Sequence, residues 1–419
     1  MKRNIVLKTC AVFMSVIITL LSAGCNSGVK VLEIPSADTT EGLDADSDFS
    51  SAYIGLSLSV LKRAAETENK DNLLFSPLSI INALGMVANG ADGETLRQLV
   101  SAWGNLEPNT LNRYLKNYNG NLPQTDECSL SLANSVWVNK NAGAEFNEDY
   151  LKTVSGCFRA EMFLADFNSQ TEKSINKWVK KKTDGHIKEI INNLSPDSIT
   201  VLLNALNFDA KWTNEYEKSD VEMSEFNNYS GERSNIEMMF SDEDTYLKTE
   251  NAEGFMKNYS GGNFAFAALM PNEGTDIYDF IETLSGDKLS EILADAEHTE
   301  VKAGIPKFSF EYSADMNSIL KSMGVTHAFS SELADFSKLG KSAQGNIFIS
   351  DVIHKAYIAV DESGTEASAA TAVILKNAGM LISTDTKTVY LDRPFIFMIL
   401  DRENNIPVFL GVVTDIKSA

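Results

Sequence analysis

The feature that most constrains the fold is a run of almost entirely apolar residues at 199–208 (ITVLLNALNF), bounded on both sides by turn-forming residues. A strand that is apolar on both faces is typical of the centre of a sheet with other layers above and below it. We therefore expect a layered domain built around this strand. With 43% hydrophobic and 22% charged residues among 419, the composition is that of a globular protein with a large core.

The charge balance argues against nucleic acid as a partner. The chain has 58 acidic and 36 basic residues, a formal net charge of -22, so a basic surface for phosphate contacts is not expected. The same charge repels an anionic membrane and favours a soluble body. We expect a monomer whose contact with a membrane, if any, is made through a lipid.

Residues 1–24 are predicted to be an export signal. A basic start over residues 1–8 is followed by an apolar run at 11–21 and then by small residues. The motif at 21–25 (LSAGC) resembles a bacterial lipobox, which directs a lipid onto the thiol of Cys25. An ordinary secretory signal is the alternative. The expected location is therefore extracytoplasmic, anchored to the cell membrane by a lipid on Cys25, or secreted if the lipobox is not used.

After the signal, residues 25–47 are polar, acidic and without helical periodicity, which predicts a lipid-anchored flexible tether. Helical periodicity begins at Asp48, so the folded domain is expected to span 48–419.

A strand, a helix and a second strand are predicted over 130–138, 145–158 and 160–167. Such a unit normally has parallel strands, which would bring Cys157 near Cys128. In an oxidising compartment this pair could be bridged, but two buried thiols are the default expectation.

Sequence motifs for catalysis are missing. The chain has no G-x-S-x-G, H-E-x-x-H, P-loop or G-x-G-x-x-G motif, and its four His residues lack metal-ligand spacing. No metal or cofactor is expected. His354, within an apolar strand at 347–360, is the one candidate general base, and a buried structural histidine is the favoured interpretation. A hydrolase whose triad assembles from distant residues remains an alternative.

The segment 361–376 (DESGTEASAATAVILK) carries the functional hypothesis. Alternate positions from Thr365 onward are all small or apolar, whereas the opposite face carries Glu366 and Lys376. The pattern is that of a strand, yet Ala and Ser are poor strand formers. The segment could therefore be exposed in one state and a strand in another. The alternative is a solvated linker.

A series of motifs in a fixed order along the chain resembles those of the serpins, the serine protease inhibitor family, from about Asp48 to Ile416. They are 72–80 (NLLFSPLSI), 133–137 (ANSVW), 175–179 (INKWV), 182–185 (KTDG), Asn204-Ala205 with Phe208 and Trp212, 268–271 (ALMP), 305–308 (IPKF), 354–356 (HKA), 364–367 (GTEA) and 393–395 (RPF). The resemblance implies an α+β fold with three β-sheets, eight or nine helices and an exposed reactive-centre loop at about 362–388.

The resemblance also implies a mechanism. A serine protease would attack the loop, and the cut loop would insert into the main sheet before the acyl-enzyme is hydrolysed, distorting the protease. The native state would then be a kinetic trap. The hinge of this movement would be Glu362, Gly364, Thr365, Glu366, Ala367, Ser368, Ala369 and Ala370. Its inward positions are uncharged, as insertion into a core requires. A non-inhibitory serpin-fold binding protein, cleaved as a plain substrate, is the alternative.

By the family's spacing, the reactive bond would be Ala378–Gly379. A small residue there suits elastase-like or subtilisin-like proteases, while Lys376, Met380 and Leu381 are alternatives, the first pointing to a trypsin-like target.

The resemblance further assigns two groups of supporting residues. A hydrogen-bonded cluster beneath the centre of the sheet would contain Ser76, Ser79, Asn204 and His354, and Trp212 would lie where the loop enters.

Overall fold

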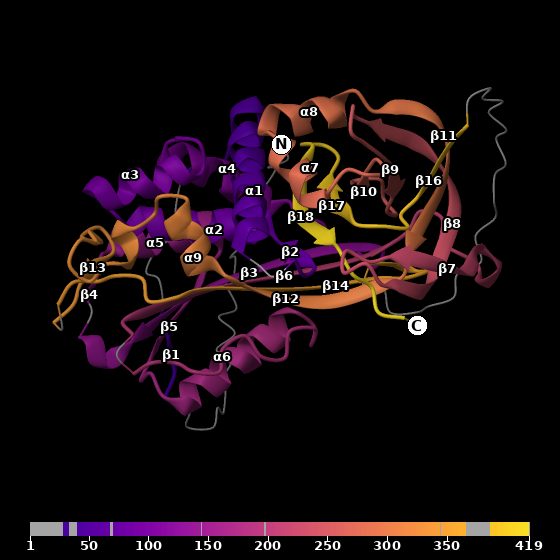
Figure 1. Cartoon of the computed structure of the whole chain (residues 1–419). Coiled ribbons are helices and arrows are strands. Elements are labelled where there is room, and N and C mark those ends of the chain that lie inside the picture. Colours follow the sequence, from indigo (N-terminus) through magenta and orange to yellow (C-terminus); the bar gives the residue numbers. More distant parts are fainter. Residues whose placement is uncertain are drawn as a thin grey trace, which may run out of the picture.

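The computed structural model describes residues 28–32, 40–67, 70–143, 145–196, 198–343, 345–365 and 386–418 (Figure 1). These residues form three sheets, of seven, nine and two strands. They also form nine α-helices: α1 (Ser47–Thr67), α2 (Pro77–Gly90), α3 (Gly93–Ala102), α4 (Pro108–Gly120), α5 (Glu148–Phe158), α6 (Ser169–Lys182), α7 (Ile277–Thr283), α8 (Gly286–Ala294) and α9 (Met316–Ser322). The α+β fold with three sheets expected from the sequence is confirmed.

The seven-stranded sheet consists, in spatial order, of β1 (Lys30–Val31), β5 (Glu161–Ala165), β3 (Cys128–Asn139), β6 (Thr200–Lys211), β15 (Gly364–Thr365), β14 (Val352–Val360) and β12 (Phe308–Asp315). The nine-stranded sheet consists of β16 (Lys387–Tyr390), β11 (Glu297–Pro306), β8 (Arg233–Lys248), β9 (Ala252–Asn258), β10 (Phe264–Pro271), β17 (Phe395–Asp401), β18 (Ile406–Val413) and β2 (Leu73–Phe75), with β7 (Val221–Asn227) paired to β8. The smallest pairs β4 (Glu145–Phe146) with β13 (Gly340–Lys341).

Strand β6 lies in the middle of the seven-stranded sheet and is covered on both faces, as the apolar run predicted. Leu206 and Phe208 face the main core. Leu203 and Ala205 face a second, smaller core beneath α6, which crosses the other side of the sheet (Figure 1). Neighbouring residues point to opposite faces of a strand, so only a continuous apolar run can serve two cores at once.

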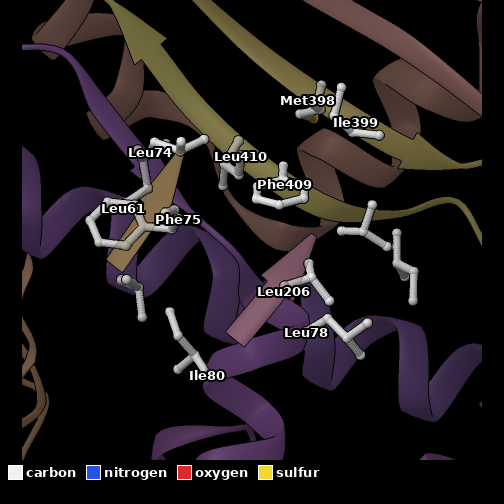
Figure 2. Close-up of a cluster of buried hydrophobic side chains, with 14 of the residues drawn as sticks. Leu61, Leu74, Phe75, Leu78, Ile80, Leu206, Met398, Ile399, Phe409 and Leu410 are labelled. Carbon is white, nitrogen blue, oxygen red and sulfur yellow. The ribbon is translucent and has the colours of Figure 1, made fainter. Parts of the chain in front are cut away.

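Helix α2 packs between the two large sheets. It begins after Ser76, whose hydroxyl accepts the Ser79 N–H, and Pro77 occupies the first turn, where no N–H is needed. Figure 2 shows Leu78 of α2 beside Leu206 of β6, and Leu74 of β2 beside Leu410 of β18. The main core therefore joins the two sheets through this helix.

The predicted strand-helix-strand unit is present as β3, α5 and β5, with β3 and β5 parallel. Strand β5 begins opposite Ser135, in the middle of β3, so Cys157 at the end of α5 lies beside that point. Cys128 is at the start of β3, about 20 Å further along the strand. Both are buried thiols with no disulfide between them.

The segment predicted as a flexible tether includes two parts with defined structure. Residues 28–32 contribute β1, which pairs antiparallel with β5 at the edge of the sheet. Residues 40–46 run along α4, where the Leu43 N–H donates to the Arg113 carbonyl at 3.0 Å. Backbone pairing of this kind needs no apolar pattern, which explains why the composition did not reveal it. Within the described residues, no helix is long and apolar enough to cross a membrane.

Candidate functional site

The candidate site is an opening in the seven-stranded sheet, between β6 and β14. These strands pair directly, and in parallel, only at Leu202–Val352 and Leu203–Ile353. Seven residues beyond the pair Leu203–Ile353, Thr365 of β15 lies between the two strands. Its partners are Ala210 of β6 and Val360 of β14, and β15 is antiparallel to both strands. The two long strands are therefore in step at both ends of the opening, and a two-residue strand already holds them apart at one end.

A tight turn carries the chain from β14 back into the sheet as β15. The Asp361 N–H donates to the Gly364 carbonyl at 3.0 Å, and the Asp361 carboxylate accepts the N–H groups of Ser363 and Gly364. A Cβ atom on Gly364 would lie 2.0 Å from the Ala210 carbonyl oxygen. Only glycine therefore permits β15 to lie this close to β6.

Trp212, which is fully buried, holds this turn by two hydrogen bonds. Its backbone N–H donates to the Ser363 carbonyl and its indole N–H donates to the Asp361 carbonyl, each at 2.9 Å. The N–H of Tyr216 donates to the Glu362 carbonyl at 3.0 Å. The structure thus places Trp212 in contact with the predicted hinge.

Glu362, the first predicted hinge residue, is partly exposed and forms an ion pair. Its carboxylate lies 2.9 Å from the Lys307 ammonium, which lies 2.8 Å from Glu237 on its other side. Partial burial raises the pKa of Glu362, but the hydrogen bond and the charge of Lys307 and a backbone hydrogen bond together outweigh it, so the pKa is lower than usual. Lys307 belongs to a motif noted in the sequence, although no role was assigned to it.

Thr365 points inward and is 2% exposed. Its hydroxyl oxygen lies 2.5 Å from the Tyr259 hydroxyl. The Tyr259 ring stacks on Trp212, with ring centroids 4.4 Å apart. No sequence pattern indicated a role for Tyr259, because this residue follows β9 in the other sheet and contacts the hinge only in the folded chain.

A polar cluster lies beneath the sheet, near the end of the opening where β6 and β14 pair directly. His354 of β14 accepts the Ser76 N–H at its Nε2 atom (3.2 Å), and Ser76 caps α2 by accepting the Ser79 N–H. Asn204 of β6 donates instead to Asn134 of β3. The predicted cluster is thus divided into two groups, one on each side of the opening.

Two features of this cluster bear on chemistry. Burial lowers the pKa of His354 to about 4, so the ring is neutral at pH 7, and a backbone N–H occupies its Nε2 lone pair. This arrangement suits a structural acceptor better than a general base. On the other side, the Oδ1 atom of Asn204 is buried, and no hydrogen-bond donor reaches it within the described part of the chain.

Comparisons with known proteins agree with this geometry. The family described as serpin (serine protease inhibitor) matches residues 51–416. The chain belongs to the serpin family. Serpins are generally protease inhibitors that target serine proteases, rather than enzymes. An uncharacterized serpin-like protein of Thermococcus kodakarensis is 33% identical over 82% of this chain and 80% of its own, and serpin B6 of Pongo abelii is 31% identical over 84% and 96%.

Solved serpin structures give the same result. The native state of the thermophilic serpin tengpin superposes with a TM-score of 0.86 and 40% identity, covering 91% of this chain and 97% of that one. The latent state of tengpin gives a TM-score of 0.80 at 39% identity, over 90% and 100%. Thyroxine-binding globulin in complex with thyroxine gives 0.75 at 26% identity, over 88% and 99%. This serpin is thus more similar to native than to latent tengpin.

Some predicted site residues lie outside the described residues. They are the lipidation residue Cys25, the hinge residues Glu366, Ala367, Ser368, Ala369 and Ala370, and the reactive-bond residues Ala378 and Gly379.

Proposed function

We propose that this serpin inhibits a serine protease as a suicide substrate, by inserting its cleaved loop between β6 and β14. The observation that carries the proposal is β15: Gly364 and Thr365 already lie in the opening, hydrogen-bonded between the two strands that the loop would separate. The register between β6 and β14 is the same at both ends of the opening, so one longer strand could pair with both of them.

The register of β15 supports this proposal in detail. If the strand continued in the same antiparallel register, residue 371 would come between Asn204 and His354, six residues from Ala210 and Val360. Residues 367, 369 and 371 would face the core, as Thr365 does, and they are Ala, Ala and Thr. The inward face therefore carries no charge that would oppose burial.

The target that we propose is an elastase-like or subtilisin-like protease cutting at Ala378–Gly379. The support is the small side chain of Ala378, which fits a shallow or apolar primary pocket. Incubation with elastase, subtilisin and trypsin, followed by SDS gels and mass spectrometry, tests both the mechanism and the bond. We expect an SDS-stable complex with elastase or subtilisin and a cut after Ala378.

Cleavage without a stable complex would instead favour a non-inhibitory binding protein. Thyroxine-binding globulin shows that the same fold can carry a small ligand. The melting temperature separates the two outcomes, because only an inserting loop should stabilise the cleaved protein.

We also propose that a lipid on Cys25 anchors the protein outside the cytoplasm. The support is the lipobox-like motif at 21–25. Incorporation of labelled palmitate in a bacterial host tests the proposal. The Cys25→Ser variant should lose the label, whereas Cys128→Ser should keep it.

A further inference from the structure

We propose that Tyr259 is a positioning residue for loop insertion: its buried hydroxyl holds Thr365 in the sheet before any protease acts. The inference rests on the proposed inhibitory function and adds to it a residue outside the loop and outside the opening. It concerns the pair of hydroxyls formed by Tyr259 and Thr365, called the hydroxyl pair below.

The phenol of Tyr259 is fixed before it meets the hinge. An antiparallel bridge joins the backbones of Tyr259 and Trp212, and the two rings stack at an angle of 12°. Phe208 also packs against the Tyr259 ring in an edge-to-face arrangement, with centroids 5.1 Å apart. Tyr259 is fully buried. Its hydroxyl therefore has one orientation, and that orientation meets Thr365.

Both hydroxyls of the pair are buried, so each depends on the other. Burial is the main cause that raises the pKa of Tyr259 well above its usual value, and the phenol stays protonated. A buried hydroxyl that loses its partner shifts an equilibrium by roughly tenfold or more, whereas removing both partners together costs much less. Withdrawal of β15 from the sheet would leave the Tyr259 hydroxyl without the partner that it has here.

This asymmetry gives the hydroxyl pair a role in timing. After cleavage, insertion competes with hydrolysis of the acyl-enzyme, and insertion can begin only in molecules whose first hinge residues lie between β6 and β14. The hydroxyl pair raises the fraction of molecules in that state. Without it, more molecules should be hydrolysed as substrates before the loop inserts.

The first experiment needs no protease. Amide hydrogen exchange of a peptide covering residues 361–365 is measured in wild type, Tyr259→Phe, Thr365→Val and the double variant. We expect each single variant to exchange about tenfold faster at β15, and the double variant to exchange no faster than the single ones. Tyr216→Phe is the matched control, since Tyr216 is also buried nearby but its hydroxyl contacts Ser241 (3.2 Å).

The second experiment measures the number of inhibitor molecules consumed per protease molecule trapped. Tyr259→Phe should raise this number at least about twofold, and the rate of the initial attack on the loop should stay the same. Unchanged amide exchange in Tyr259→Phe, an equal effect of Tyr216→Phe, or additive effects in the double variant would each overturn the hydroxyl pair. If wild type traps no protease at all, the inhibitory function fails, and the exchange data still decide whether the hydroxyl pair holds β15.

Discussion

The two large sheets are built differently. In the nine-stranded sheet, every residue of β10, β17 and β18 is buried, and these strands pair antiparallel along nearly their whole length. In the seven-stranded sheet, β6 and β14 are in direct contact at only two residue pairs, and a two-residue strand separates them further along. The continuous pairing of β10, β17 and β18 leaves no room for an added strand between them, whereas the opening between β6 and β14 does.

The largest expected effect follows from a charge placed in the opening. Thr365→Arg puts a guanidinium at a position that is 2% exposed, where desolvation opposes entry of the hinge. We expect the protease to cleave this variant without forming a detectable SDS-stable complex, and the cleaved form to gain no thermal stability. Ser363→Arg is the control, because Ser363 lies on the turn outside the strand, and it should still trap the protease. Complex formation by Thr365→Arg at the wild-type level would contradict the role of the opening.

A substitution in the nine-stranded sheet should lower stability without affecting loop insertion. Phe397 of β17 is fully buried, and Phe397→Ala is expected to lower the free energy of unfolding by about 3–5 kcal/mol. Intact and cleaved proteins should lose stability equally, so the rise in melting temperature on cleavage should remain. Calorimetry on both forms measures this. A variant that loses the rise itself would show that the two sheets do not contribute independently.

Acid should destabilise the folded protein through His354, which lies near the end of the opening where β6 and β14 pair directly. The pKa of His354 is about 4 in the folded protein, compared with 6.5 without burial, so the unfolded chain binds the proton first as the pH falls. The contribution of the neutral His354 ring to the free energy of unfolding is complete above about pH 6.5 and is lost toward pH 4, a difference of about 3 kcal/mol. Urea unfolding at pH 7 and pH 4.5 measures it. His354→Gln keeps an acceptor for the Ser76 N–H but cannot titrate, and its pH dependence should be smaller by that amount.

The smallest effect is expected at the outer surface of the turn. The ion pair between Glu362 and Lys307 is partly exposed, and such pairs contribute less than about 1 kcal/mol. Glu362→Gln should therefore shift the melting temperature by no more than a few degrees and leave protease trapping intact. A loss of trapping would mean that this ion pair, and not the buried side of the turn, holds β15 in place.

The sequence was most informative where a residue's own pattern reports its burial. The apolar run at 199–208 predicted a strand with two cores, and the strand-helix-strand unit was found with parallel strands. Contacts between distant segments were not predictable in this way. Tyr259 lies 106 residues from Thr365, and the partner of Asn204 is Asn134, 70 residues away. Local periodicity shows that a side chain is buried, but not which side chain it meets.

The turn at Asp361–Gly364 has a kinetic consequence. Because β14 and β15 are joined by so few residues, they already form a β-hairpin. Lengthening a hairpin whose bend is in place requires no further loop closure, the slow and entropically unfavourable part of pairing distant strands. Hairpins form within on the order of 1–10 μs. If the loop inserts as proposed, each added residue would join the one before it, and the response to a severed peptide bond would come before a bound enzyme has time to release it.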